Sequence, residues 1–353
     1  MAFLKELESK KDKLRKVDTP KEQKHIDKLL FENDDDYIRL LRETNFENYY
    51  SLIEEFTFKS VIISLTTDEI KALYEENVGF GNNPVDISNK LFPSLNGIED
   101  KINEGIRLIR DKTKNPSSKC FLRLSTRSPK DAIFHMNNFP DLYASKLKQV
   151  TECDSVPSHG KVQIYDKLMA FYLASTEILS ISEGSQGIKM LVVSNRIQGD
   201  LKMYVEMSEP LNLIIREFVQ FPVEHELRGF VWKKNFTALS QYNNIAFLPS
   251  LVKNKVEIEA KVKTFMEKFI QIVGEKVENF VVDIVLDYDG KVWVVELNPF
   301  GELAGSCLFS WITDRDLLLN EDGRYEFRIQ ETPPELTYIK GELSEKVIDF
   351  LDI

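Results

Sequence analysis

The sequence predicts an α+β protein. Short segments rich in β-branched and aromatic residues, at 56–65, 211–221 and 226–242, are typical of strands. Several of these segments follow one another through short turns, which favours antiparallel pairing, and stretches with helical periodicity lie between the blocks. Strands grouped in this way, with helices between the groups, indicate an α+β fold.

Length and cysteine content limit the class of protein. The 353 residues are enough for two or three lobes. Three cysteines are too few and too scattered for a disulfide framework or a thiolate metal site, and the four histidines show no ligand spacing. No apolar run reaches the ~18 residues of a membrane span, and the N-terminus lacks the apolar stretch of a secretory signal. We therefore expect a cytoplasmic protein without a membrane segment.

The charge of the chain bears on its ligands. The formal net charge is −11. Such a charge disfavours non-specific binding to the nucleic-acid backbone. An anionic ligand must therefore be held by a focused site.

The N-terminal part predicts an arm, a strand and two helices. Residues 1–45 are dense in Lys, Glu and Asp and predict a charged helical arm. The strand at 56–65 leads to a helix that Thr67 begins, with acidic residues in its first turn. A loop at 79–84 precedes a second helix over 97–110.

Residues 120–132, CFLRLSTRSPKDA, predict a strand that runs into the start of a helix. Ser128 suits the N-cap, Pro129 suits the first helical position, and Asp131 completes a short capping box. The free N–H groups of a helix start also suit an anion, beside which Lys130 would lie.

The middle of the chain contains a motif with two interpretations. Residues 161–181 predict a long amphipathic helix, and the stretch 188–194 predicts a strand. The sequence SEGSQG at 182–187 lies between them. Turn chemistry favours a plain helix-to-strand turn, and the alternative is a glycine-rich loop over phosphates with Lys189 behind it.

The C-terminal part predicts mostly strands. The blocks at 211–221 and 226–242 are strands, the second with a turn near 233–235, and a charged helix from about 256 to 273 follows. A short strand near 324–330 and a final helix near 342–351 end the chain.

The stretch 278–302, ENFVVDIVLDYDGKVWVVELNPFGE, predicts two apolar strands that carry charged residues. If residues 289–290 form a two-residue type I′ turn, counting back pairs Asp283 with Glu296. Asn298 lies two residues beyond Glu296 and shares its face because side chains alternate with period two. A four-residue loop keeps all three side chains on one face, and only an odd loop length breaks the arrangement.

Three oxygen-bearing side chains on one face point to a cation. Carboxylates opposed across a strand pair repel each other at a Cβ separation of ~5 Å, and a divalent cation removes that repulsion. Carboxylate and amide oxygens are ligands that suit Mg²⁺. A shared proton, or pairing with nearby Lys and Arg, is the structural alternative for the two carboxylates.

These motifs resemble a known family. Asp on one strand, then Glu-x-Asn on the next, resembles the metal-binding hairpin of ATP-grasp proteins. VVDIVLDYDGKVWVVELNPFGE followed by SCLFSW resembles the cell division cycle protein 123 family. FENYYSLIEEFTFKSVIISL, LRLSTRSPKDA, IIREFV and ELRGFVWKKNFTALSQY also resemble phrases of that family, in family order from about residue 46 onward.

The resemblance implies a fold and a division of the chain. The fold is an ATP-grasp fold, in which two α+β lobes clasp a nucleotide between them. The implied segments are the arm at 1–45, an N-terminal lobe at 46–210, a C-terminal lobe with the metal hairpin at 211–311, and a C-terminal segment at 312–353 that packs back on the lobes.

The resemblance also implies site residues. It implies nucleotide-binding roles for Arg123, Lys130, Asp131, Glu217, Phe218, Val219 and Arg228, and metal-binding roles for Asp283, Glu296 and Asn298. Arg123 stands where the family carries a Lys that reaches the phosphates, and residues 217–219 form the hinge whose backbone meets the adenine edge. For Arg123 or Arg228 taken singly, an ordinary surface ion pair is the favoured interpretation. The combined motif is what supports their binding roles.

For function, the resemblance implies an assembly chaperone that binds ATP and Mg²⁺ and the γ subunit of translation initiation factor 2. An ATP-dependent ligase or phosphotransferase is the alternative, because Mg²⁺ and arginines suit such chemistry. Departures from the family pattern keep it open: Arg123 for Lys, 126–127 Thr-Arg for Trp-Ser, and Tyr242 for Arg. A scaffold that binds no nucleotide is disfavoured by the three oxygen ligands in register.

Overall fold

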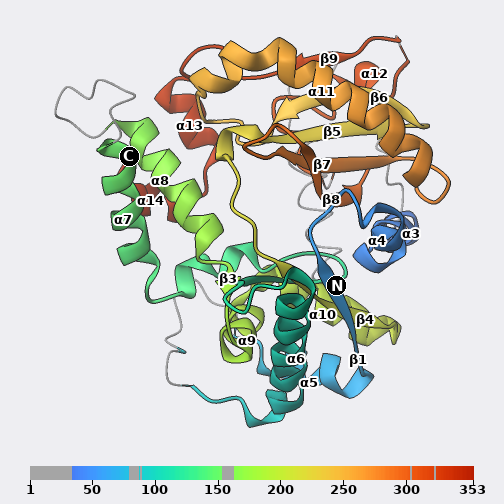
Figure 1. Ribbon diagram of the computed structural model, residues 1–353, viewed down its shortest axis with the longest axis vertical. Coiled ribbons are helices and arrows are strands. Elements are labelled where there is room, and N and C mark those ends of the chain that lie inside the picture. The colour runs from blue at the N-terminus through green and yellow to red at the C-terminus, as the bar shows by residue number, and fades with distance from the viewer. Residues whose placement is uncertain (1–33, 79–86, 88–89, 153–162, 303, 322) are drawn as a thin grey trace. The chain divides into compact units, whose positions relative to one another are not determined.

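The chain forms two compact units. The computed structural model describes residues 34–78, 87, 90–152, 163–302, 304–321 and 323–353, with side chains from residue 39 onward. Unit 1 comprises Met1–Thr57 and Gln220–Leu343, and unit 2 comprises Phe58–Val219 and Ser344–Ile353. Both units combine helices with a mainly antiparallel sheet (Figure 1), which confirms the predicted α+β class. Residues 1–33 of the predicted arm and the loop predicted at 79–84 lie outside the described residues.

Unit 1 is built on a five-stranded sheet with the order β8-β7-β5-β6-β9. All neighbours are antiparallel except β6 and β9, which are parallel. Its elements are α3 (Asp34–Glu43), α4 (Phe46–Ile53), β5 (Glu226–Trp232), β6 (Asn235–Gln241), α11 (Pro249–Val273), β7 (Phe280–Leu286), β8 (Val292–Pro299), α12 (Arg315–Leu318), β9 (Glu326–Arg328) and α13 (Leu336–Glu342). The sequence therefore predicts this sheet strand by strand.

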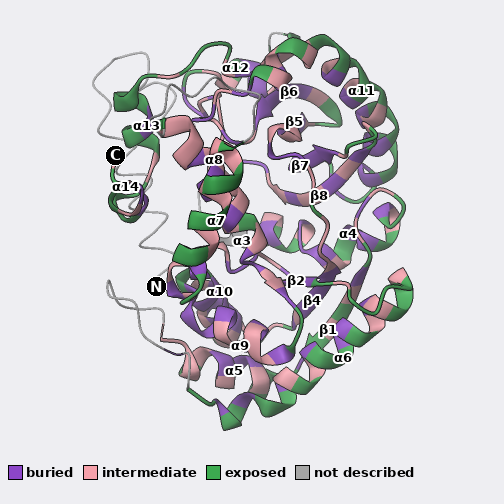
Figure 2. Ribbon diagram, turned by 60° about the vertical axis from the view of Figure 1, so that its left-hand side comes forward, coloured by how far each residue is buried: buried purple, intermediate pink, exposed green. Residues whose placement is uncertain are grey.

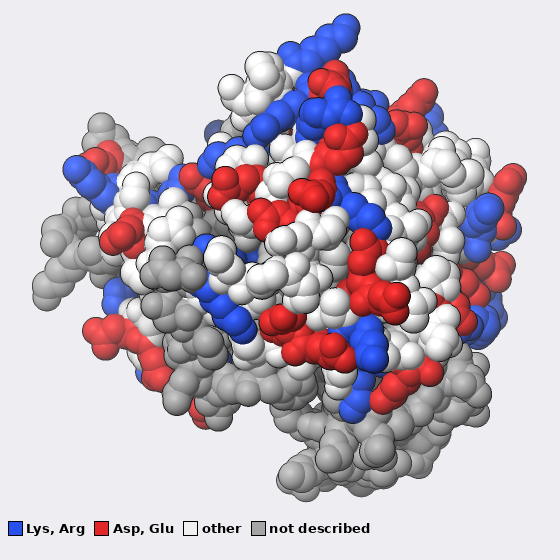
Figure 3. All heavy atoms as spheres, turned by 90° about the horizontal axis from the view of Figure 1, so that it is seen from below, with Lys and Arg blue, Asp and Glu red and all other residues white. Residues whose placement is uncertain are grey.

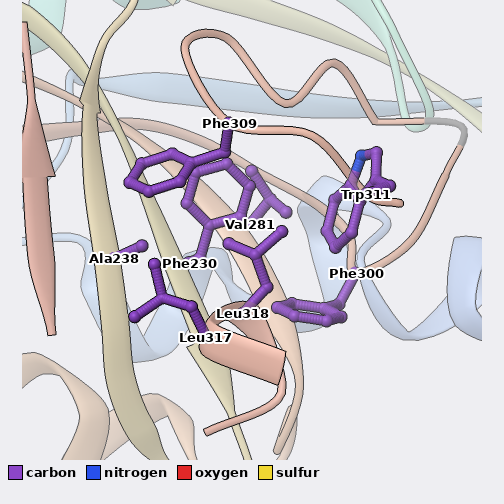
Figure 4. Packing of buried hydrophobic residues seen from close by; sticks show 8 residues of the cluster. All are labelled: Phe230, Ala238, Val281, Phe300, Phe309, Trp311, Leu317 and Leu318. Atoms are coloured by element: carbon purple, nitrogen blue, oxygen red, sulfur yellow. The ribbon is translucent and has the colours of Figure 1, made fainter. Parts of the chain in front are cut away.

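The two faces of the unit 1 sheet are covered by different segments. On one face, Phe269 of α11 contacts Phe280 of β7 with ring centroids 6.1 Å apart. On the other face, Phe230 of β5 contacts both Phe309 and Trp311 at 5.6 Å (Figure 4). Because neighbouring residues of a strand point to opposite faces, β7 is buried along its whole length, which explains its nearly continuous apolar sequence.

Unit 2 is built on a four-stranded sheet with the order β1-β4-β2-β3, all antiparallel. Its elements are β1 (Ser60–Leu65), α5 (Thr67–Glu76), α6 (Asn96–Thr113), β2 (Cys120–Leu124), the 3₁₀ turn η2 (Lys130–His135), α7 (Phe139–Thr151), α8 (Ile164–Glu177), β3 (Ser180–Ile181), α9 (Gly184–Val193), α10 (Asn195–Met207), β4 (Leu211–Glu217) and α14 (Glu345–Leu351). Helix α6 packs on β1 and β4, and the buried residues follow the strands and the helix faces turned toward them (Figure 2).

Local chemistry explains where the helices of unit 2 begin. Thr66 caps α5, and its side chain and that of Glu69 form a reciprocal capping box, one residue before the predicted start. Gly105 lets α6 approach the sheet, because a Cβ at this position would lie 2.6 Å from the side chain of Ile215. The predicted helix at 97–110 is thus confirmed, with one more turn at its end.

The strand predicted at 188–194 is wrong. These residues belong to α9, and α10 follows directly. Helix α9 is buried on nearly every side, so its apolar run has no visible period of 3.6 and resembles a buried strand. Gly184 and Gly187 begin this helix and pack tightly against α6, since a Cβ at either position would meet atoms of Glu99 or Ile102.

The boundaries of the units differ from the segments expected from the sequence. The boundary predicted at 210/211 would separate β4 from the other strands of unit 2. In the structure β4 is a central strand of that sheet, and unit 2 extends to Val219. Residues 312–343 belong to unit 1 through α12 and β9, while only the last residues, including α14, belong to unit 2. The final helix predicted near 342–351 is confirmed as α14, and the shorter helix α13 precedes it.

In the part of the chain that the structure describes, neither the helices nor the charges on one face mark a specialised surface region. Among the described residues, no helix is both long enough and apolar enough to cross a membrane. On the face shown in Figure 3, basic and acidic side chains are interspersed.

Candidate functional site

The hairpin β7–β8 reaches the predicted pairing by a different route. The N–H of Asp287 bonds the carbonyl of Lys291 at 3.0 Å, so the loop between them has three residues, and Gly290 adopts a φ of +76°. An odd loop alone would move Glu296 away from Asp283. A bulge between Asp283 and Ile284 shifts the register by one residue and restores the pair Asp283–Glu296.

A polar row crosses the whole sheet of unit 1. The register pairs Arg328 with Ser240, Ser240 with Arg228, Arg228 with Asp283, and Asp283 with Glu296. Paired residues point to the same face, so these five side chains share one face of β9, β6, β5, β7 and β8. The polar row is the candidate site.

An apolar row lies beside the polar row. It runs from Ala238 through Phe230 and Val281 to Asn298, which is the one polar member. The Nδ2 of Asn298 lies 3.3 Å from Oδ2 of Asp283. The structure thus brings together Arg228, Asp283, Glu296 and Asn298 of the predicted site.

The centre of the polar row is a buried bidentate ion pair. Arg228 donates from Nε to Oδ1 and from Nη2 to Oδ2 of Asp283, each at 2.7 Å. Asp283 is 1% exposed and Arg228 is 8% exposed. This fork-to-fork geometry fixes the plane of the carboxylate. Asp283 is thus paired with a nearby arginine, which is the structural alternative that the sequence leaves open for the two carboxylates.

Electrostatics keeps Arg228 charged. Burial is the largest single effect on the pKa of Arg228 and lowers it, but the charge and hydrogen bonds of the Asp283 carboxylate, together with smaller effects of Cys307 and Tyr242, raise the pKa well above its ordinary value. The ring of Tyr242, whose centroid lies 5.0 Å from the guanidinium carbon, adds a cation–π contact. Tyr242 stands where the resembled family carries Arg, so the aromatic residue replaces a like charge beside Arg228.

The loop after β8 is tied to the polar row. Arg228 Nη1 donates to the carbonyl of Gly305 at 2.7 Å, and Ser240 Oγ accepts the N–H of Leu308 at 3.1 Å. Trp311 Nε1 donates to the carbonyl of Ala304 at 2.7 Å. The contacts of Arg228 and Ser240 therefore hold this loop at the face that carries the row, and the bond from Trp311 to Ala304 closes the loop on itself.

The donor set is chemically suitable for Mg²⁺. Each oxygen of Asp283 can accept a second partner beside Arg228, because a carboxylate offers about four lone-pair sites. Glu296 lies opposite Asp283, and the Asn298 amide lies beside it with its nitrogen toward Asp283, so that a turn of the amide group would present its oxygen to a cation. Hard oxygen donors of this number suit a cation that completes its shell with water and phosphate. Among the described residues no cluster of three or more His, Cys, Asp or Glu gathers, so this set relies on an amide.

In unit 2, Arg123 is bound to its own loop. It is 1% exposed, and it donates to the carbonyls of Leu124 at 3.1 Å and Thr126 at 2.9 Å. The guanidinium therefore fixes the backbone after β2. Whether it also reaches phosphate stays a prediction.

Lys130 and Asp131 lie at the start of η2, a 3₁₀ turn rather than the predicted α-helix. Asp131 does not cap this turn. Its carboxylate accepts Ser194 Oγ at 2.5 Å and the N–H of Arg196 at 3.1 Å, so it holds the N-cap residue of α10, Ser194, and one N–H of the first turn of that helix. The predicted capping box at 128–131 is wrong for this reason.

A second ion pair, between a partly exposed arginine and a buried carboxylate, anchors the same loop. Arg127 Nε lies 2.9 Å from Oδ2 of Asp200 on α10, and Thr126 Oγ1 also donates to that oxygen. Burial raises the pKa of Asp200, against the lowering effects of Arg127 and Thr126. The Thr-Arg pair that departs from the family's Trp-Ser is therefore used to hold the loop on α10.

The predicted hinge at 217–219 follows β4. The N–H of Glu217 donates to the carbonyl of Lys59 at 2.8 Å, and the N–H of Phe218 donates to the carbonyl of Lys119 at 3.0 Å. Two of the three hinge N–H groups thus extend the sheet of unit 2. Burial raises the pKa of the Glu217 carboxyl, which Lys59 partly opposes.

Sequence reasoning missed several residues that build these sites. Ser240 and Arg328 belong to the polar row, and a register counted outward from Arg228 would have found them. Sequence reasoning also missed two partners of Arg228, Gly305 and Tyr242, and the partner of Arg127, which is Asp200. These contacts join residues far apart in the sequence and leave no spacing signal.

The fold and the site define an α+β protein of two compact units, one of which presents a carboxylate–guanidinium row across its sheet. Residues 170–348 match the D123 family, which is more than half of the chain, and the chain belongs to that family.

Relatives and solved structures agree with this assignment. A "translation initiation factor eIF2 assembly protein" of Xenopus laevis is 30% identical over 164 residues, 40% of this chain and 48% of the relative. A "putative CDC123-like protein L884" of Acanthamoeba polyphaga mimivirus is 24% identical over 294 residues, 79% of this chain and 70% of the relative. The structure of Cdc123 from Schizosaccharomyces pombe matches with a TM-score of 0.57 and 16% identity, over 82% of this chain and 96% of that one. This likeness shows a shared fold.

The match to the assembly proteins is partial. The chain spans about half the length of the Xenopus laevis relative, 48%, and 29% of the Xenopus tropicalis relative.

Proposed function

We propose that this chain is an ATP- and Mg²⁺-binding assembly factor for translation initiation factor 2, which acts in the cytoplasm and has the γ subunit of that factor as its partner. Membership of the D123 family and the names of the relatives support the assembly role. The proposal includes an ATP-grasp fold, as the sequence motifs imply.

The polar row, with Asn298 beside it, is the observation that carries the nucleotide part of this proposal. Asp283, Glu296 and Asn298 come from two adjacent strands, on one face of an otherwise apolar hairpin. Two carboxylates so placed repel each other unless a cation or a guanidinium lies between them. Arg228 binds both oxygens of Asp283 from one side, and Glu296 lies opposite Asp283 on the neighbouring strand, so the row places two carboxylates and one guanidinium within one face.

In this proposal each residue has a defined task. Asp283, Glu296 and Asn298 hold Mg²⁺, which when bound neutralises phosphate charge. Arg228 keeps the Asp283 carboxylate in one plane. The roles proposed for Arg123, Lys130, Asp131 and residues 217–219 in nucleotide binding follow from the family resemblance, and Arg228 is also a candidate for phosphate contact.

The first test is ATP binding by the full chain, measured by calorimetry with and without Mg²⁺. We expect Mg²⁺ to strengthen ATP binding, and Glu296→Gln to remove most of that gain because it removes a charged ligand. Asp289→Asn, in the exposed turn of the same hairpin, is the matched control and should behave as wild type. Equal ATP affinity with and without Mg²⁺ in the wild type would overturn the metal assignment.

The second test is capture of the γ subunit by the immobilised full chain, with analysis of the nucleotide in the bound fraction. We expect the γ subunit to be retained with ATP still intact. Failure to retain it would overturn the assembly role. Release of ADP, AMP or pyrophosphate that depends on an added acceptor would instead identify an ATP-dependent ligase or phosphotransferase.

A further inference from the structure

Residues 49–57, the last residues of unit 1 before the chain enters unit 2, contact the outer edge of β8. The hydroxyl of Tyr49 on α4 accepts the N–H of Leu297 at 3.1 Å. Eight residues later, Thr57 forms a parallel bridge with Val294, and Phe56 accepts the N–H of Val294 at 2.7 Å. The Thr57 Oγ1 also donates to the carbonyl of Val294 at 2.7 Å. The segment 49–57 therefore contacts β8 at two points.

The contacting side chains are fully enclosed. Tyr49 is 0% exposed and Thr57 is 2% exposed. The Phe46 ring lies 5.5 Å from the ring of Tyr49, and Phe56 contacts Phe265 of α11 at 5.7 Å. The segment is thus fixed to the body of unit 1 as well as to the strand.

The two contact points lie on opposite sides of the β8 bulge. In a regular strand, backbone groups turn to the same edge at every second residue. Val294 and Leu297 both turn to the outer edge although they are three residues apart, because the bulge inserts one extra residue between them. The hydroxyl of Tyr49 is the acceptor for the N–H group that the bulge turns outward at Leu297.

The register that these contacts select decides where the candidate ligands point. If the register set by the turn continued without the bulge, Val295 would pair with Asp283, and Glu296 would pair with Val282. Glu296 and Asn298 would then point to the face covered by α11. The bulged register keeps both on the face of Asp283, and Leu297, the residue bonded by Tyr49, lies between them.

We propose that Tyr49 and Thr57 are positioning residues for the Mg²⁺ site, which clamp β8 on both sides of its bulge and so hold Glu296 and Asn298 beside Asp283. This inference rests on the proposed function for its ligand, and on the contacts above for the clamp itself. It assigns a task to the stretch FENYYSLIEEFT at residues 46–57, which contains both positioning residues.

The test uses Tyr49→Phe in the full chain, which removes one hydroxyl and keeps the ring. Tyr50→Phe is the matched control, because Tyr50 lies on the same helix and its hydroxyl donates to Glu54, the C-cap residue of that helix, at 3.3 Å. Thr57→Val is the second variant and removes the contact on the other side of the bulge. Two quantities are measured: amide hydrogen exchange at Leu297, and the Mg²⁺ concentration that half-saturates the enhancement of ATP binding.

We expect Tyr49→Phe to speed exchange at Leu297 about tenfold, the effect of leaving a buried donor without its acceptor. We expect the half-saturating Mg²⁺ concentration to rise about fivefold, with ATP affinity in the absence of Mg²⁺ unchanged. Thr57→Val should act in the same direction, and Tyr50→Phe should change neither quantity.

The outcomes separate the clamp from the proposed function. If Leu297 exchanges no faster in Tyr49→Phe, or if Tyr50→Phe acts equally, the clamp is overturned. If exchange rises but the half-saturating Mg²⁺ concentration stays as in wild type, Tyr49 supports the strand without positioning the ligands, and the inference is also overturned. If wild-type ATP binding does not respond to Mg²⁺ at all, the proposed function fails and the positioning role fails with it, while the exchange data still decide whether Tyr49 holds β8.

Discussion

The predicted site residues of unit 1 contact one another, whereas those of unit 2 contact other parts of their unit. In unit 1, Arg228, Asp283, Glu296 and Asn298 meet on one face of adjacent strands. In unit 2, Asp131 holds the first turn of a helix and Arg123 binds carbonyls of its own loop. The difference teaches that a strand ladder converts sequence spacing directly into geometry, whereas loops and helix caps depend on partners far away in the sequence.

The largest effect is expected from the ion pair of unit 1. Asp283→Ala leaves the Arg228 guanidinium buried without its carboxylate, which typically costs about 3–5 kcal/mol. We expect the free energy of unfolding, measured by urea denaturation, to fall by about that amount. Asp289→Ala in the exposed turn of the hairpin is the control and should change it by less than about 0.5 kcal/mol. A similar loss in both variants would mean that the buried pair has no special weight.

The corresponding pair in unit 2 should be weaker. Arg127→Met leaves Asp200 without its cation, but Arg127 is 24% exposed at its side chain and water can replace part of the interaction. We expect a loss of about 2 kcal/mol in the free energy of unfolding.

Arg107→Met is the control for Arg127. Arg107 pairs with Glu104 and Asp111 at the surface with 61% of its side chain exposed, and such pairs contribute about 0–1 kcal/mol. If Arg127→Met cost as much as Asp283→Ala, the distinction drawn between the two units would be wrong in energetic terms.

The hairpin shows why the sequence predicts unit 1 well. Apolar alternation and the turn residues predict two strands, and the pair Asp283–Glu296 is confirmed. The predicted two-residue turn is wrong, and the bulge that compensates for it leaves no mark on apolarity, because Val294 and Val295 are alike. The prediction of the pair was therefore right while one of its premises was not.

Unit 2 shows what the sequence could not predict. Helix α9 is enclosed on nearly all sides, so its sequence shows neither the helical nor the strand period, and its apolar run predicts a strand. The role of Asp131 depends on α10, some 60 residues further along the chain, as the 63-residue separation of its bond to Ser194 shows. No local pattern carries such a contact.

Asp131 offers a sharper test of the comparison between units. If it serves only to hold Ser194 and the first turn of α10, Asp131→Ala should lower the free energy of unfolding by about 1 kcal/mol, the usual effect of losing a capping contact. ATP affinity should then change little, and calorimetry of the same variant measures it. Asp141→Ala, in the first turn of α7, whose N-cap residue Asn138 forms no side-chain capping bond, is the control. A large loss of ATP affinity without loss of stability would give Asp131 a direct role in binding.

The smallest effect concerns pH and distinguishes unit 2 from unit 1. Burial lowers the pKa of His135 in unit 2, and the Lys346 ammonium lowers it further, against the opposing effect of Asp131. The unfolded chain, with the ordinary pKa of 6.5, therefore takes up a proton before the folded chain does. Stability is then complete above about pH 6.5 and falls as the pH drops below it toward the folded pKa.

His135→Phe should remove this part of the pH dependence, and Lys346→Ala should reduce it, because the pKa of His135 would rise toward its ordinary value. Urea denaturation between about pH 7 and pH 5 measures the slope for each variant. Variants of the ion pair in unit 1 should keep the wild-type slope in this range, because an arginine with a raised pKa stays charged throughout. An unchanged slope in His135→Phe would place the acid sensitivity elsewhere, and the two units would then differ in the geometry of their sites but not in their response to pH.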